Sequence, residues 1–181
     1  MRREILSTRR LLLREMTDED FPALCRMLQD PEVMYAYEHA FPDEEAWEWL
    51  RRQQDRYARD GIGLWAVVEK ASGEMVGQCG LTWQDCGRES PVLEVGYLLE
   101  KAAWHKGYDT EAAQACRDYA FTHLGAEEVF SLIRDNNLPS QAVARRNGME
   151  VRGQFVKHYY GVTMPHMIFS VKKAGNEESL L

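Results

Sequence analysis

The sequence predicts an α+β fold, with a mixed and mostly antiparallel β-sheet of about seven strands flanked by about four helices. Three observations lead to this prediction. Alternating apolar residues, typical of strands, recur along the 181-residue chain. Apolar residues at helical spacing lie between these segments, and turn-forming residues separate them. The predicted order is strand, two helices, three strands, helix, strand, helix and two strands.

The N-terminal part contains one strand and two helices. Residues 8–15 alternate as a strand, and Thr17, followed by acidic residues, is a typical N-cap for a helix that runs to about Gln29. Asp43 is the predicted N-cap of a second helix, which Gly61 ends. The buried stripe of this second helix is predicted at Trp47, Leu50, Gln54 and Tyr57.

The middle of the chain predicts three antiparallel strands, at residues 64–69, 74–83 and 92–99, followed by a helix at 110–124. Gly125 closes this helix. Its buried face carries Ala113, Cys116, Ala120 and Leu124. Small residues at this spacing favour close packing of the helix on a sheet.

The remainder predicts a strand, a short helix and two strands, at residues 129–134, 137–146, 150–159 and 163–171. No linker or low-complexity block interrupts the pattern, so we expect a single domain over residues 1–173. Residues 174–181 are small and acidic and predict a loose tail.

Composition argues against several functional classes. The formal charge of −7 argues against a nucleic-acid-binding surface. Basic pairs are interpreted as solvated helix faces, although a local anionic ligand stays open for them; they are Arg9 and Arg10, Arg51 and Arg52, and Arg145 and Arg146. The four cysteines and five histidines lack metal-ligand spacing, so we expect free thiols and no metal. With no signal sequence or apolar segment of membrane-spanning length, we expect a cytoplasmic protein that is neither exported nor inserted.

One stretch predicts an anion site. A strand containing Gly96 leads through a short turn to Lys106, Gly107 and Tyr108 at the start of a helix rich in small residues. Such a turn directs unpaired backbone N–H groups and the positive end of the helix toward one point, as pyrophosphate binding requires. An ordinary strand-to-helix turn fits the same residues, and the local pattern leaves both interpretations open.

Four motifs, in this order and within the predicted elements, resemble the GNAT superfamily of acyl-CoA-dependent N-acyltransferases over nearly the whole chain. Within that superfamily, the chain resembles the subgroup that includes the ribosomal-protein N-terminal acetyltransferases. The motifs are Glu94-Val95-Gly96-Tyr97, Trp104-His105-Lys106-Gly107-Tyr108-Asp109-Thr110-Glu111-Ala112, Asp135-Asn136-Asn137-Leu138-Pro139-Ser140 and Arg146-Asn147-Gly148-Met149.

The resemblance implies acetyl-CoA as co-substrate. It implies cofactor contacts at Tyr97, Leu98, Trp104, His105, Lys106, Gly107, Tyr108, Asp109, Thr110, Asn137, Ser140 and Arg146. Three of these positions depart from the family pattern: Trp104 stands at the first position of the acyl-CoA loop, His105 where relatives tend to have Gly, and Asp109 where a minimal side chain is usual. Because a carboxylate repels a pyrophosphate, we expect Asp109 to point away and cap the helix.

The resemblance also implies catalytic roles. Glu94 aligns with a strand carboxylate that serves as general base in some members, directly or through a water; a structural carboxylate paired with a neighbour is the alternative. A backbone N–H after Glu94, nearest Tyr97 or Leu98, is expected to stabilise the oxyanion. Ser140 is expected to assist the departing thiolate and to hold the pantetheine arm; the alternative is an ordinary polar residue in the first turn of a helix.

The acceptor amine is expected over the aromatic segment that precedes the second helix and near the last hairpin. The candidate residues are Tyr35, Tyr37, Glu38, His39, Tyr159 and Tyr160. An aromatic wall with one acid suits a cation, although Tyr-rich loops also serve simple packing. The acceptor could be a protein N-terminus or a small-molecule amine, and the protein a monomer or a homodimer.

The function that follows is transfer of an acetyl group from acetyl-CoA to a primary amine by direct attack in a ternary complex. The alternative is a non-catalytic acyl-CoA-binding sensor or scaffold with a degenerate site.

Overall fold

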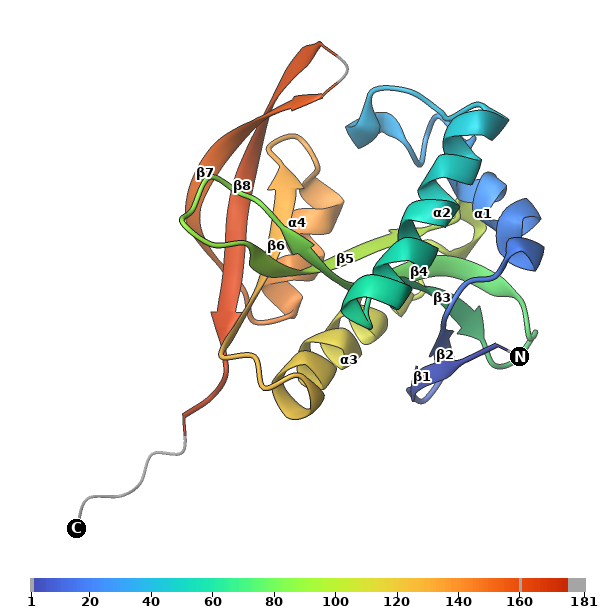
Figure 1. The fold of residues 1–181 in the computed structure, drawn as a ribbon, viewed down its shortest axis with the longest axis horizontal. Coiled ribbons are helices and arrows are strands. Elements are labelled where there is room, and N and C mark those ends of the chain that lie inside the picture. The colour runs from blue at the N-terminus through green and yellow to red at the C-terminus, as the bar shows by residue number, and fades with distance from the viewer. Residues whose placement is uncertain (1, 160, 176–181) are drawn as a thin grey trace.

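The computed structural model describes residues 2–159 and 161–175. Within them, eight strands form one sheet in the order β1-β2-β3-β4-β5-β6-β8-β7 (Figure 1). The strands are β1 Glu4–Ser7, β2 Leu11–Arg14, β3 Leu64–Glu69, β4 Met75–Gln84, β5 Val92–Leu99, β6 Glu128–Arg134, β7 Glu150–Tyr159 and β8 Val162–Lys172. The helices are α1 Phe21–Leu28, α2 Asp43–Asp60, α3 Tyr108–His123 and α4 Leu138–Arg146, with 3₁₀ turns η1 Asp18–Asp20, η2 Tyr35–Tyr37 and η3 Lys101–Ala103.

The predicted α+β class with a mixed sheet is confirmed, with one strand more than expected. The predicted strand at 8–15 begins inside a turn, because the N–H of Thr8 donates to the carbonyl of Leu11 at 2.8 Å. The hydroxyl of Thr8 also accepts from the N–H of Leu11 at 3.0 Å. The predicted strand is therefore confined to β2, and the turn joins it in an antiparallel hairpin to β1, which the sequence did not predict. The predicted tail lies outside the described residues from position 176 onward.

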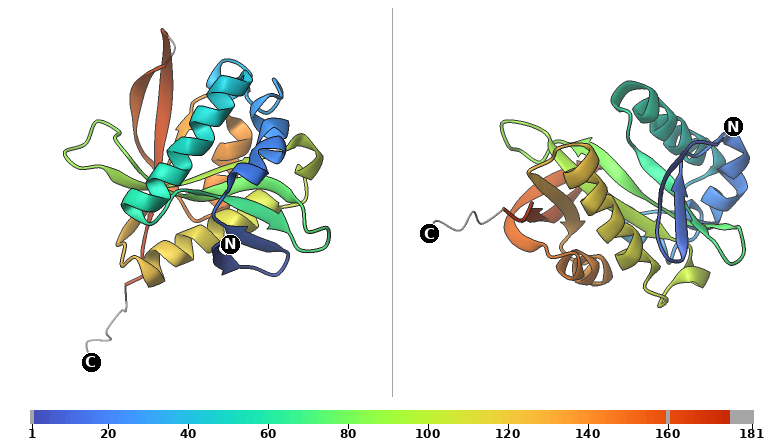
Figure 2. Two further views of the ribbon diagram at one scale, coloured as in Figure 1. Left: turned by 45° about the vertical axis from the view of Figure 1, so that its right-hand side comes forward. Right: turned by 90° about the horizontal axis from the view of Figure 1, so that it is seen from below.

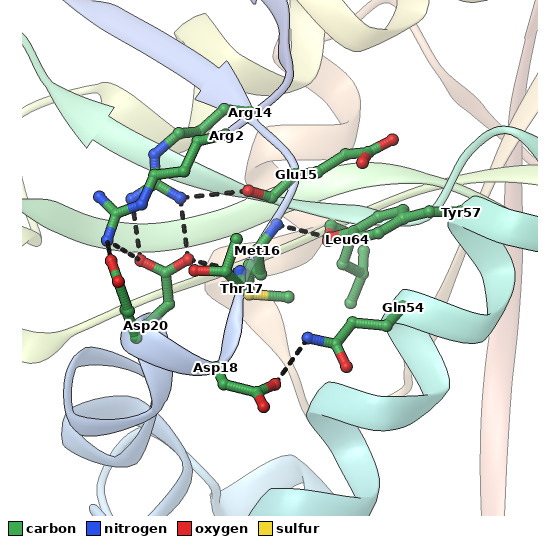
Figure 3. Close-up of polar contacts among 11 residues, drawn as sticks. Arg2, Arg14, Glu15, Met16, Thr17, Asp18, Asp20, Gln54, Tyr57 and Leu64 are labelled. Atoms are coloured by element: carbon green, nitrogen blue, oxygen red, sulfur yellow. Dashed lines mark hydrogen bonds and ion pairs between the residues drawn. The ribbon is translucent and has the colours of Figure 1, made fainter.

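A buried ion pair holds the corner between β2 and α1 (Figure 3). Both terminal nitrogens of Arg14 donate to the Asp20 carboxylate at 2.8 Å, and the N–H of Thr17 donates to the same carboxylate at 2.8 Å. Thr17 is the N-cap of the 3₁₀ turn η1, whereas Asp20 is the N-cap of α1, so the predicted helix begins as a 3₁₀ turn before α1. Gln54 on α2 donates to Asp18 at 2.9 Å and so links this corner to the second helix.

Helix α2 departs from its prediction at its start and along its buried face. Pro42, rather than Asp43, occupies the N-cap, so Asp43 is the first helical residue. The buried residues are Ala46, Trp49, Leu50 and Gln53. Trp47 instead stacks on Phe21 of α1, with ring centroids 3.8 Å apart. A helix that packs against both a sheet and another helix has two contact faces, which a single stripe does not predict. Gly61 ends α2 with a φ of 73°, as predicted.

The sheet separates two apolar layers, because successive strand side chains point to opposite faces. On β3, Trp65 and Val67 belong to the cluster that includes α3, whereas Ala66 and Val68 pack with α1 and α2. Figure 2 shows α1 and α2 on one side of the sheet and α3 and α4 on the other. The core therefore lies on both faces of the central strands.

Helix α3 packs through small side chains, as its sequence predicts. Ala113, Cys116 and Ala120 are fully buried. Leu124 is 41% exposed, so its predicted place on the buried face is wrong. It is the C-cap beyond the last helical residue, followed by Gly125 at a φ of 66°, and the chain there turns away from the sheet.

The parallel pair β5 and β6 separates soon after it forms. Glu94 and Phe130 are its one register pair, whereas β6 pairs with β8 over its whole length. Figure 1 shows β5 and β6 diverging, with the β7–β8 hairpin rising on the same side as the segment before α2. This divergence leaves backbone groups of both strands without a strand partner and positions the site described next.

Candidate active site

A cavity of about 480 Å³ lies where β5 and β6 diverge. Its walls come from α2, β5, β6, α4, the β7–β8 hairpin and the segment before α2. Six of the residues that the sequence predicted for catalysis or binding line it: Tyr37, Glu94, Tyr97, Leu98, Asn137 and Ser140. Segments distant in the chain therefore meet in a space large enough for a small-molecule site.

Glu94 stands at the point of divergence. One carboxylate oxygen accepts a 2.7 Å hydrogen bond from the N–H of Leu132 on β6, and no described residue hydrogen-bonds the other oxygen. Burial raises the pKa of Glu94 to about 7, although the Leu132 N–H and the positive charges of Lys157 and Arg56 act in the opposite direction. A carboxylate with a pKa near 7 in a cavity can accept a proton at physiological pH.

The backbone N–H of Tyr97 faces the gap between the diverging strands. The N–H of Glu100 donates to the carbonyl of Val76, next to β4. In an antiparallel ladder every second residue donates its N–H to the same neighbouring strand, so the N–H groups of Leu98 and Gly96 also point to β4. The N–H of Tyr97, which lies between them, points away from β4 and toward β6. Of the two predicted oxyanion donors, the ladder therefore favours Tyr97 over Leu98.

The N-terminus of α4 closes this side of the cavity. The Asn137 side chain is its N-cap and accepts from the N–H of Ser140 at 3.3 Å. The hydroxyl of Tyr97 donates to the carbonyl of Ser140 at 2.7 Å, which ties α4 to β5. Both backbone groups of Ser140 are thus held, while no described residue bonds its hydroxyl. That hydroxyl lines the cavity with its hydrogen-bonding capacity unused.

The predicted acyl-CoA loop, residues 104–110, lies outside the lining of the 480 Å³ cavity. His105, at a φ of 63°, and Gly107, at 76°, lead the exposed backbone into α3. The indole of Trp104 turns inward and donates to the carbonyl of Leu99 at 3.2 Å. Lys106 is exposed. The loop therefore presents backbone at the start of α3, as the anion-site interpretation requires.

Two side chains of this loop are already engaged within the protein. The carboxylate of Asp109 accepts from the N–H of Thr110 at 2.8 Å, so it occupies one donor of the first helical turn. Gly107, not Asp109, is the N-cap of α3, which corrects the expected capping role of Asp109. The hydroxyl of Tyr108 donates to Glu69 on β3, and Arg10 lies over its ring at 4.5 Å.

The predicted acceptor residues divide between the cavity and its surroundings. Tyr37 lines the cavity and contacts Trp49 edge-on, and its pKa is raised to about 12 by burial and by the charge of Glu94. Tyr35 donates from its hydroxyl to Asn137 at 2.8 Å. His39 pairs with Glu45 at 2.8 Å.

Glu38, Tyr159, Tyr160 and Arg146 complete the predicted set. Glu38 forms a 2.9 Å ion pair with Arg134, so the single acid of the aromatic segment is neutralised. Tyr159 ends β7, but its side chain, like the whole of Tyr160, lies outside the described residues. The exposed Arg146 accepts through its carbonyl from Gln114 at 3.2 Å.

Sequence reasoning missed several cavity residues of basic type: Arg52, Arg56, Lys157 and His166. The sequence predicts a solvated face for Arg51 and Arg52 and leaves a local anionic ligand open; both residues are exposed. The available signal was helical spacing, because Arg52 and Arg56 lie one turn apart and flank the buried Trp49 and Gln53. Lys157 on β7 and His166 on β8 carry no comparable signal in the sequence, because their place in the cavity depends on how the β7–β8 hairpin approaches α2.

No helix among residues 2–159 and 161–175 is long and apolar enough to cross a membrane. In the same part of the chain, no cluster of three or more His, Cys, Asp or Glu side chains could hold a metal ion.

Comparison with known proteins agrees with this architecture. Residues 10–150 match the family model described as an acetyltransferase (GNAT) domain. The chain is 36% identical to the uncharacterized protein YkkB of Bacillus subtilis, over 80% of this chain and 84% of that one. It is 33% identical to the uncharacterized N-acetyltransferase p20 of Bacillus licheniformis, over 76% and 77% of the two chains.

Solved structures show the same fold. An acetyltransferase from Agrobacterium tumefaciens superposes with a TM-score of 0.78 at 26% identity, over 93% of this chain and 94% of that one. RimL, a ribosomal L7/L12 alpha-N-protein acetyltransferase, superposes with a TM-score of 0.80 at 18% identity, over 96% of both chains. The family model, these relatives and the cavity at the diverging strands lead to one conclusion: the chain belongs to the GNAT acetyltransferase family, whose acetyl donor is acetyl-CoA.

Proposed function

We propose that this protein is an N-acetyltransferase that moves the acetyl group of acetyl-CoA to a primary amine by direct attack within a ternary complex. The observation that carries the proposal is the position of Glu94, a half-buried carboxylate whose pKa is raised to about 7, in the same cavity as the inward-facing N–H of Tyr97. These two groups are what acyl transfer to an amine requires, namely a proton acceptor and an oxyanion donor.

Each residue has a defined task. Glu94 accepts a proton from the acceptor ammonium, whose free pKa near 10 keeps it charged at neutral pH. The N–H of Tyr97 donates to the thioester oxygen, where negative charge develops as the nitrogen attacks. The hydroxyl of Ser140 lies in the same cavity and is available to donate to the departing sulfur. The new amide C–N bond replaces the C–S bond, and the proton lost by nitrogen neutralises the thiolate.

The residues that would hold acetyl-CoA are the backbone of the 104–110 loop and the groups around Ser140. The fit is supported by the exposed positive-φ turn at the start of α3 and by the unpaired backbone of β5. Acetyl-CoA, when bound, supplies the acetyl group as an activated thioester. Helix N-termini and exposed N–H groups are suited to its diphosphate.

The test is to incubate the protein with acetyl-CoA and a panel of amines and to follow the release of free thiol. We expect release that requires both an amine and Glu94. Binding of acetyl-CoA by calorimetry with no thiol release on a broad panel would instead support a non-catalytic acyl-CoA-binding module. Failure to bind any coenzyme A would contradict both functions.

A further inference from the structure

Basic side chains dominate the charges that line the cavity on its acceptor side. Arg52 and Arg56 come from α2, Arg134 from β6 and Lys157 from β7. The acidic lining residues are Glu94 and Asp85. Because the Glu94 carboxyl is partly protonated at neutral pH, its negative charge offsets the four cations only in part.

Two of these cations lack a carboxylate partner. Arg134 is paired with Glu38 at 2.9 Å, but neither Arg52 nor Arg56 forms an ion pair with any described residue. Arg56 donates a 3.2 Å hydrogen bond to the side-chain amide oxygen of Gln53. Arg56 is half-buried, whereas Arg52 is exposed at the rim.

The arrangement of this arginine pair is unfavourable without an anion. The two residues are four positions apart on one helix, a spacing at which like charges repel. Burial lowers the pKa of Arg56, and the neighbouring charge of Arg52 lowers it further. An anionic group between them would relieve this repulsion, and a guanidinium binds a carboxylate or phosphate through two parallel hydrogen bonds.

The same arginines and Glu94 face one space. Arg56 acts electrostatically on Glu94, and both residues line the cavity. The acid that the sequence offered for a cationic acceptor, Glu38, is neutralised by Arg134 and does not line the cavity. One end of the site therefore takes a proton from an amine, while the other presents unpaired positive charge.

We propose that the acceptor is a small primary amine that also carries a carboxylate or phosphate group, with its nitrogen at Glu94 and its anion at Arg52 and Arg56. This inference rests on the proposed function and names the substrate class of the same site. A small molecule is favoured over a folded protein because the cavity of about 480 Å³ has the size of a small-molecule site and must also admit the acetyl group.

The test compares matched pairs of amines that differ in the anionic group. The pairs are γ-aminobutanoate with butylamine, phenylalanine with phenethylamine, and phosphoethanolamine with ethanolamine. Spermidine and a short peptide with an acidic N-terminal sequence complete the panel. In at least one pair, we expect kcat/KM for the amine that carries a carboxylate or phosphate to exceed that of its partner without one by about tenfold or more, as bidentate binding to arginine implies. The pair that responds distinguishes a carboxylate from a phosphate.

Variants locate the effect on α2. Arg52→Gln and Arg56→Gln are each expected to reduce the ratio of kcat/KM between the amine that carries an anionic group and its partner that lacks one, mainly through KM. Because Arg56→Gln also removes a positive charge that lowers the Glu94 pKa, this ratio, and not either kcat/KM alone, is the readout. Arg52→Glu is expected to shift preference toward spermidine. Arg51→Gln is the matched control, since Arg51 lies outside the cavity lining and over the Trp47 ring at 5.8 Å. Calorimetric binding of coenzyme A to each variant reports that it remains folded.

The outcomes separate this inference from the proposed function. If amines without an anionic group, spermidine included, are acetylated as well as those that carry one, or better, the inference is wrong and acetyl transfer stands. If only the acidic peptide reacts, the acceptor is a protein N-terminus, and the small-molecule assignment is overturned. If acetyl-CoA binds and no amine reacts, the proposed function itself fails.

Discussion

The N–H of Leu132 on β6 donates a 2.7 Å hydrogen bond to the Glu94 carboxylate on β5, across the point where the two strands separate. This bond takes the place of the next rung of the parallel ladder. It orients one oxygen of Glu94 and leaves the other facing the cavity. Strand divergence thus supplies both the space of the cavity and the position of the proposed general base.

Glu94→Gln is expected to lower kcat/KM by about 100-fold or more, the usual contribution of a general base. In the wild type, kcat/KM should rise with pH through about 7, as the Glu94 carboxyl loses its proton. Thiol release measured across pH in both proteins tests this rise in kcat/KM near pH 7, which should be absent from the pH profile of the variant.

The other groups that face Glu94 do not account for such a step. They are Tyr37, whose pKa is raised to about 12, and Arg56 and Lys157, whose positive charges act to lower the pKa of Glu94. Burial lowers the pKa of His166, in the same cavity, below 6.5. A step near pH 7 that persists in Glu94→Gln would assign the proton transfer elsewhere.

Glu94→Gln should also change how stability depends on pH. The folded-state pKa of Glu94 is raised from 4.5 to about 7, so the folded protein binds this proton more tightly than the unfolded chain does. The resulting contribution to the free energy of unfolding is fully present below pH 4.5 and is lost as pH rises through 7. The free energy of unfolding of the variant should therefore exceed that of the wild type by on the order of 2 kcal/mol at pH 8, and by little at pH 4.5. Urea unfolding at both pH values measures the difference.

Gly96→Ala is expected to impair activity without unfolding the protein. A Cβ at this position would lie 3.8 Å from the unbonded Glu94 oxygen and 3.4 Å from Leu64, both ordinary contacts. It would narrow the cavity beside the general base, so we expect KM for the acceptor to rise about tenfold with an unchanged melting temperature. Gly80→Ala is the contrasting variant, because its Cβ would lie 2.0 Å from the carbonyl oxygen of Gly63. We expect this variant to have a lower melting temperature than the wild type.

Ser140→Ala should lower turnover by about 10- to 100-fold and weaken acetyl-CoA binding less, since a hydrogen bond to a charged sulfur is worth about 1.5–3 kcal/mol. The backbone bonds that Ser140 makes with Asn137 and Tyr97 do not involve its hydroxyl, so the fold should be kept. Single-turnover rates and calorimetry separate the two effects. Unchanged turnover would remove Ser140 from the mechanism.

Asp109→Ala should tighten coenzyme A binding or leave it unchanged, because it frees the N–H of Thr110 and removes a negative charge from the start of α3. Asp109→Asn, which keeps the acceptor oxygen but not the charge, distinguishes the two contributions. Calorimetry provides both dissociation constants. A clear loss of affinity in the alanine variant would mean that the carboxylate supports the loop.

Asp20→Asn is expected to destabilise the fold by roughly 3 kcal/mol or more, because it breaks a buried, bidentate ion pair with Arg14. Burial acts to raise the pKa of Asp20, but the bonds from Arg14 and Thr17 outweigh it and lower the pKa below 3.8. The stabilisation is therefore present above pH 3.8 and is lost as pH falls below it. Glu19→Gln, whose side chain is 80% exposed, is the control and should change stability by less than about 1 kcal/mol in denaturant titrations.

Local sequence was sufficient for most elements of the fold. Strands β3, β5 and β7 and the glycine end of α2 lie where periodicity and turn residues predict them. The errors occur where a contact, rather than a pattern, decides the outcome. The Thr8 turn shortens the predicted strand to β2 and pairs it with β1, a strand that the sequence did not predict, and Trp47 stacks on Phe21 of α1.

The sequence by itself determined the fold class, the family resemblance and the catalytic candidates Glu94 and Ser140, because hydrophobic period and short motifs are local properties of the chain. Only the tertiary structure decided that these residues share a cavity with Arg52 and Arg56, and that Glu38 is neutralised by Arg134. The charge presented to an acceptor depends on which side chains from distant segments meet, and pairing between strands and helices sets those distances.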